Sequence, residues 1–190
     1  MKQLNQPDFT WQNPHKAPAL CWKAAAHPLT LFRGLAAKPN PADSLAFLFL
    51  VLLTPLALAF FLGKLSANSA ATRLATNFFE GVFLAWLLYL TANRLFRARA
   101  GFERMLAVFC LSSWPWLFYG LIPWLSKFQG EMTLAGLLVL RFAYLLVGMR
   151  VALKMPAWQS VGSTLIGLVG LLLVEFLLGT LFTRLGAAFS

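Results

Sequence analysis

Five apolar runs, each of about twenty residues, decide what this chain can fold into. They cover residues 45–63, 74–93, 105–125, 132–149 and 160–183, and short charged segments separate them. A helix of this length matches the hydrocarbon thickness of a bilayer. Inside lipid the backbone must satisfy its own hydrogen bonds, so helices are expected rather than an open sheet. The sequence therefore predicts an all-α, polytopic membrane protein, a bundle of five transmembrane helices.

The chain before the first run divides into two parts. Residues 1–19 are rich in Gln, Asn and Pro and predict a flexible N-terminal tail. Residues 20–40 predict an amphipathic membrane-surface segment, because the apolar side chains of residues 28–38 fall on one side of a helix too short to span. Such a helix either lies on lipid or packs on the bundle. Residues 41–184 form the transmembrane domain.

Lysine and arginine are distributed unevenly between the two sides of a five-span bundle. One side holds the N-terminal region, the arginine loop (residues 94–104) and the turn at 150–154, and carries eleven of the sixteen Lys and Arg residues against four on the other side. Because these residues are retained in the cytoplasm, we expect a cytoplasmic N-terminus and an outside C-terminus in an inner (plasma) membrane. The predicted cytoplasmic basic face, suited to anionic lipid headgroups, consists of Arg33, Lys38, Arg94, Arg97, Arg99, Arg104, Arg150 and Lys154. This topology accounts for the net charge of +10 without nucleic acid.

Three prolines interrupt the apolar runs, at Pro55, Pro115 and Pro123. A proline removes one backbone donor and pushes the preceding residue away from helical geometry. The sequence therefore predicts helix kinks at these positions.

Three ionisable residues fall inside the apolar runs: Glu80, Arg141 and Glu175. A charge at a helix centre costs roughly 2.5–3.5 kcal/mol on insertion scales, so such residues face the bundle interior and pair. Arg141 and Glu175 lean toward each other, because side chains tilt toward the N-terminus of their own helix and the two helices run in opposite directions. We expect them to pair, with Glu80 near enough to join. The pair either sets helix packing or forms a polar binding site.

The sequence lacks the common enzyme and cofactor signatures. The sequence has no HExxH, GxSxG or Walker A pattern, and no Cys/His set of the kind that binds a metal. We therefore expect no enzymatic activity, no cofactor and no metal site.

Several short motifs resemble those of the Yip-domain (Ypt-interacting-protein-like) family, in its small prokaryotic form. Pro28, Phe32 and Arg33 precede the first run; Gly101, Phe102, Ser112, Ser113 and Pro115 mark the third; Gly148 and Arg150 close the fourth. The resemblance covers roughly residues 28–183 and implies five spans with a cytoplasmic N-terminus. In eukaryotic members it implies GTPase partners and vesicle traffic. That part does not carry over, because the chain lacks an Asp-Leu-Tyr-Gly-Pro stretch and its cytoplasmic tail is short.

Two functions are compatible with these features. The first is a non-enzymatic accessory, scaffolding or membrane-organising component, which contacts lipid and another membrane protein or a second copy of itself. The second is a small transporter or channel subunit with a polar site around Arg141 and Glu175. A water-filled cavity that reaches these charges distinguishes the second from the first.

Overall fold

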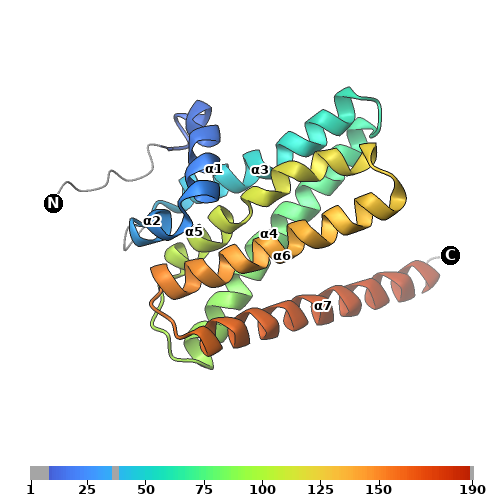
Figure 1. Cartoon of the computed structure of the whole chain (residues 1–190). Helices are drawn as coiled ribbons and strands as arrows, with labels where there is room; N and C mark the ends of the chain where they lie inside the picture. The colour runs from blue at the N-terminus through green and yellow to red at the C-terminus, as the bar shows by residue number, and fades with distance from the viewer. Residues whose placement is uncertain (1–8, 36–38, 189–190) are drawn as a thin grey trace.

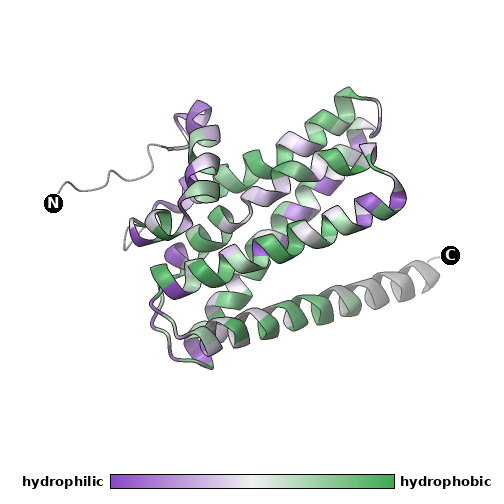
Figure 2. Ribbon diagram, viewed as in Figure 1, coloured by the Kyte–Doolittle hydropathy of each residue, from purple (hydrophilic) through white to green (hydrophobic). Residues whose placement is uncertain are grey.

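The computed structural model describes residues 9–35 and 39–188, and beyond Val174 chiefly their backbone. Every regular element in this part of the chain is a helix (Figure 1). Five stretches are long and apolar enough to cross a membrane, so the predicted all-α, five-span architecture is confirmed. They belong to α3 (Pro41–Phe61), α4 (Ala67–Arg94), α5 (Phe102–Ser112) continued by the 3-10 helix η2 (Trp114–Trp124), α6 (Lys127–Ala152) and α7 (Ala157–Ala188). Figure 2 shows apolar residues along these helices and hydrophilic residues gathered in the loops and N-terminal helices.

The spanning helices begin before the apolar runs do, because polar caps extend them. The Asn40 side chain accepts a hydrogen bond from the Ala42 amide at 3.1 Å, and Pro41 occupies the first turn of α3. Ser126 and Gln129 form a capping box at the start of α6, each side chain accepting from the other's backbone amide.

The α5–η2 span lies at the centre of the bundle. Two-thirds of this span is buried (67%), against 39% or less for each of the other four. Every residue from Met105 to Pro115 is buried, and the span packs against α3, α4 and α6. Helix α7 lies outside this group and packs on α4 and α6.

The α-helical geometry of this span ends just before Pro115. The Ser112 and Ser113 hydroxyls donate to the Phe109 carbonyl at 2.7 and 3.0 Å, which satisfies a carbonyl at the buried helix end. The chain then continues as 3-10 helix from Trp114. Because a 3-10 helix repeats every three residues, Trp116 and Tyr119 align on one side of η2.

A close crossing joins η2 to α3. A Cβ atom at Gly120 would lie 3.1 Å from the Cα and 3.2 Å from the Cβ of Pro55, so any other residue would push the two helices apart by a few tenths of an ångström. The α3 helix itself runs through Pro55 to Phe61. Bends at Pro55 and Pro123 stay predictions, and the Pro123 side chain lies outside the described residues.

The N-terminal chain folds onto one end of the bundle as η1 (Pro14–Lys16), α1 (Ala17–Ala26) and α2 (Pro28–Arg33). Residues 9–19, which the sequence placed in a flexible tail, are held by two contacts: the Phe9 ring lies 5.7 Å from that of Phe47, and the Trp11 amide donates to Asp43 Oδ1 at 2.8 Å. Residues 1–8 lie outside the described part.

Helix α2 takes the second of the two arrangements left open by the sequence and packs on the bundle. Phe32 is fully buried beside Gly148 of α6, where a Cβ would lie 3.0 Å from the Phe32 ring. Leu29, one turn before Phe32 on α2, is 48% exposed. Lys38 lies outside the described residues.

Helix α7 packs mainly on α4 along a face of small residues. A Cβ at Gly167 would lie 2.9 Å from a Leu88 methyl group, and one at Gly170 would lie 3.5 Å from Leu87. The Thr91 hydroxyl donates to the Ser163 carbonyl at 3.4 Å. Small residues allow the two backbones to approach closely, as is usual between membrane helices.

Candidate functional site: a polar intramembrane cavity

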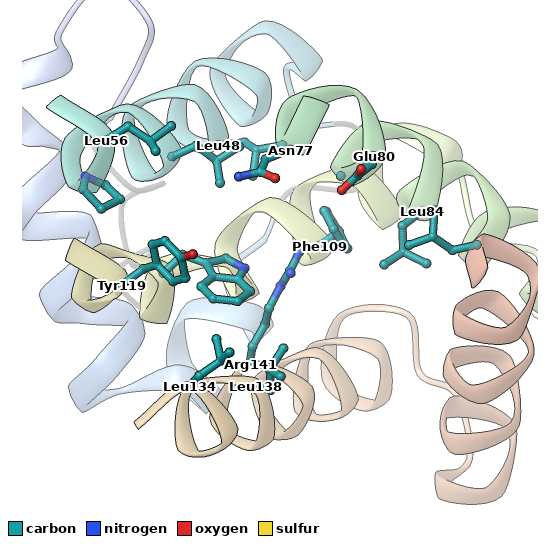
Figure 3. A pocket seen from close by; sticks show the side chains of 15 residues that line it. Leu48, Leu56, Asn77, Glu80, Leu84, Phe109, Tyr119, Leu134, Leu138 and Arg141 are labelled. Carbon is teal, nitrogen blue, oxygen red and sulfur yellow. The ribbon is translucent and has the colours of Figure 1, made fainter. Parts of the chain in front are cut away.

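A cavity of about 400 Å³ lies inside the membrane-spanning region, between α3, α4, α6 and η2 (Figure 3). Its walls are mostly leucine and aromatic side chains. Four polar residues interrupt them: Asn77, Glu80, Tyr119 and Arg141. An apolar pocket with a few converging polar groups is the usual form of a small-molecule site.

Arg141 is the positive charge of this cavity. Its guanidinium carbon lies 4.7 Å from the centroid of the Phe109 ring and 5.6 Å from that of Trp116. Aromatic faces attract a cation, most strongly where water is excluded. These two rings hold the arginine in place from the central span, and Figure 3 shows its side chain reaching from α6 toward Phe109.

Glu80 and Asn77 form the opposite wall. They are three residues apart on α4 and therefore share a face of that helix. Figure 3 shows both side chains entering from α4, across the cavity from the base of Arg141. Gly81 packs here against Leu48 and Phe109, and a Cβ at this position would lie 3.4 Å from each of them, in ordinary contact.

Of the predicted polar cluster, the structure describes the side chains of Glu80 and Arg141. Glu80 and Arg141 line the same cavity. The side chain of Glu175 lies outside the described residues, so its pairing with Arg141 stays a prediction. Leu171, one helical turn before Glu175 on α7, contributes to the cavity wall.

The described residues of the predicted basic face gather at the opposite end of α6 from its capping box. We define the basic end as α2, the arginine loop and residues 150–156. Its exposed cations are Arg33, Arg94, Arg97, Arg99, Arg150 and Lys154. Arg104 is half-buried instead, and its Nη2 donates to the Leu35 carbonyl at 3.3 Å.

The arginine loop is fixed by its own hydrogen bonds. The Asn93 side chain donates to the Ala100 carbonyl at 2.9 Å and accepts from the Ala100 amide at 2.8 Å. The Phe96 ring packs edge-on against Trp158 of α7, with centroids 5.5 Å apart. The loop is thereby held beside the turn from α6 to α7.

In the described part of the chain, no three His, Cys, Asp or Glu side chains are grouped as a metal would require.

One protein-family model covers all five spans at least in part. The Yip1 domain model matches residues 22–179, which is most of the chain. The chain belongs to the Yip1-domain family. This confirms the family resemblance carried by the short motifs of the sequence. No curated protein and no solved structure matches the chain.

Some residues of the Yip1-domain cavity could not be identified from the sequence. Asn77 carried a weak signal, because it lies one turn before Glu80 in an apolar run. Phe109, Trp116 and Tyr119 carried none, since every residue around them is also apolar or aromatic and the side facing the cavity depends on how α5 and η2 pack.

Proposed function

We propose that this Yip1-domain protein is a non-enzymatic accessory component that organises an inner (plasma) membrane through helix–helix and lipid contacts. The observation that supports this proposal is the basic end, where six exposed cations of α2, the arginine loop and the α6–α7 turn lie together. Anionic cytoplasmic lipids attract such a surface. The N-terminus is then cytoplasmic and the C-terminus outside.

The surface available to a partner helix lies on α7. Leu165, Val169, Leu172 and Phe176 are 52–67% exposed and recur at helical spacing along its outer side. Lipid or the helix of another membrane protein can cover such a face. The accessory function requires that a protein, either a partner or a second copy of this chain, cover it.

Purification of the tagged chain from its native membrane in mild detergent tests this function. We expect a stoichiometric membrane protein to co-elute, and we expect Leu172→Ala with Phe176→Ala to weaken that association. Phe79→Ala is the matched control, because Phe79 is an aromatic side chain of α4 with a similar exposure, 71%. A chain that elutes alone contradicts the accessory function. A homo-oligomer would restrict it to self-association.

A small transporter or channel subunit is the second candidate function, and the cavity around Arg141 favours it. Arg141 is fourteen residues into the 26-residue helix α6, near its mid-length. An ionisable residue at this depth commonly marks a solute or ion pathway. Such a pathway must contain water.

Cysteine accessibility distinguishes this function from the first. In a Cys21→Ala background, a membrane-impermeant thiol reagent labels Asn77→Cys if the cavity is water-filled. Phe79→Cys, exposed on the same helix but outside the cavity lining, is the control for lipid-facing positions. Arg73→Cys is the positive control at the outer end of α4. Labelling at position 77 equal to that at position 79 would exclude an aqueous pathway.

The proposed pairing of Arg141 with Glu175 has its own test. Charge reversal at either residue alone should lower the amount of folded protein in the membrane, and the double variant Arg141→Glu with Glu175→Arg should restore it. If the double variant accumulates no better than either single variant, the two residues do not pair.

A further inference from the structure

A second hollow, of about 490 Å³, lies at the basic end between α2 and the turn from α6 to α7. Arg150 and Lys154 provide its charge, and Leu29, Val147 and Val151 provide its apolar wall. No acidic side chain is part of the described lining. The hollow therefore combines two cations with an exposed apolar surface at one place.

The backbone at Lys154 is unusual for a residue with a side chain. Its φ angle is +56°, in the left-handed region. Lys154 directly follows the C-cap residue of α6, a position that glycine commonly occupies because it has no Cβ. The amides of its neighbours Leu153 and Met155 both donate to the Met149 carbonyl, at 3.2 and 3.3 Å. The turn is closed by these bonds, so the strained residue is held in place.

The same conformation recurs at two other residues, and both are cations. Arg97 and Arg99 of the arginine loop have φ angles of +54° and +53°, and with Lys154 they are the only such non-glycine residues in the described chain. Strain of this kind is unfavourable for a residue with a Cβ and gathers at functional positions. A long basic side chain thus occupies each of three positions where glycine would be easier, and of these three only Lys154 lines the hollow.

The hollow lies at the level of a membrane surface. It forms where α6 ends, and Trp158 at the start of α7 is 66% exposed, as expected for a residue at the lipid–water interface. Val147 and Val151 are on α6 one turn apart, on the membrane side of Lys154. A ligand that occupied the hollow would place its charge at Arg150 and Lys154 and an apolar part against Leu29 and the valines.

We propose that this hollow binds one anionic phospholipid, with the headgroup phosphate between Arg150 and Lys154 and the upper acyl chains against Leu29, Val147 and Val151. The site rests on the proposed function, since it needs the basic end to face anionic lipid. It goes further in one respect. The lipid affinity of a diffuse basic surface depends on its total charge. The affinity of a specific site falls only when its own cations are removed.

Native mass spectrometry of the full-length purified chain tests the site, with phosphatidylglycerol and phosphatidylcholine of identical acyl chains as probes. We expect one phosphatidylglycerol to bind wild type about tenfold or more tightly than phosphatidylcholine. Arg150→Gln with Lys154→Gln should remove this preference. Arg97→Gln with Arg99→Gln is the matched control, because it removes the same charge from the same end and should change the affinity by less than about threefold.

Lys154→Gly separates binding from folding. It relieves the left-handed strain, so it should melt no lower than wild type, yet it should bind phosphatidylglycerol more weakly. Equal losses in the two double variants would overturn the site and leave a diffuse basic end. If millimolar inorganic phosphate displaced bound phosphatidylglycerol as effectively as free phosphatidylglycerol does, the hollow would be a phosphate site. That result would overturn the proposal of a lipid ligand. Wild type without any preference would remove both the site and the lipid contact of the basic end, while the partner test on α7 would stand independently.

Discussion

Substitution of Gly148 by alanine should destabilise the junction of α2, α5 and α6. A Cβ at this position would lie 2.6 Å from Val108 Cγ1 and 3.0 and 3.1 Å from two ring carbons of Phe32. Carbon atoms pack best at about 3.5–4.0 Å, so the Val108 contact must open by about 1 Å. Val108 and Phe32 are both fully buried, and a β-branched valine has little rotamer freedom with which to move away.

Overpacking of this kind costs about 1–3 kcal/mol. For a chain of this size the loss corresponds to a Tm lower by about 2–12 °C. Gly136→Ala is the matched control on the same helix, because a Cβ there would meet nothing within 4 Å. Alanine also favours helix over glycine by about 0.8–1.0 kcal/mol, so Gly136→Ala should leave Tm unchanged or raise it.

Thermal unfolding in detergent can be followed at Cys110, which is fully buried in α5. A thiol-reactive fluorophore labels it only when the bundle opens, provided that the partly exposed Cys21 is replaced by alanine. Val108→Ala removes the atom with the shortest contact. The double variant Gly148→Ala with Val108→Ala should therefore lose less stability than the two single variants lose together. The difference in the free energy of unfolding should be at least about 0.5 kcal/mol. If Gly148→Ala had the same Tm as Gly136→Ala, the expected steric conflict at Gly148 would be refuted.

Three further outcomes are expected. Asn93→Ala should lose both hydrogen bonds to Ala100 that close the arginine loop, at about 0.5–1.5 kcal/mol each, and trypsin should then cut the loop faster than in wild type while cutting elsewhere at the same rate. Tyr144→Phe should lose the 2.9 Å hydrogen bond from its hydroxyl to the Ala25 carbonyl and lower Tm by a few degrees, about 0.5–1.5 kcal/mol, through weaker attachment of α1 to α6. Burial raises the pKa of Cys21 from 9.0 to about 11, so less thiolate is present at pH 8 and maleimide should label Cys21 about a hundredfold more slowly than a free thiol. That difference should shrink as the pH rises from 9 to 11, and a rate that equals the free thiol at pH 8 would contradict the burial.

The five spans could be predicted because lipid imposes a simple rule on sequence. Long uncharged runs and the positions of Lys and Arg are enough to locate helices and one basic end. Two polar residues of the cavity could also be identified from the sequence, since Glu80 and Arg141 stand out in apolar surroundings. Glu80 and Arg141 reach the same cavity because they lie at similar depths in the bundle, on helices α4 and α6 that both begin at the same side of the membrane.

The remaining features depend on tertiary contacts that a single sequence does not encode locally. Residues 9–19 look like a tail by composition, and they fold because Phe9 meets Phe47, which is far away in the chain. The central place of α5 has no signature, because every span is apolar and only packing decides which one is enclosed. The crossing of η2 and α3 likewise depends on a tertiary contact, that of Gly120 with Pro55.

The 3-10 geometry of η2 sets how deep its far end lies in the bilayer. A 3-10 helix rises about 2.0 Å per residue and an α-helix about 1.5 Å. Over the eleven residues of η2 the difference is roughly 5 Å, so α-helical geometry would leave Trp124 that much further inside the hydrocarbon. The central span therefore reaches the far interface with fewer residues than α6 uses. Its length is matched to the thickness of the membrane by the type of helix rather than by the number of residues.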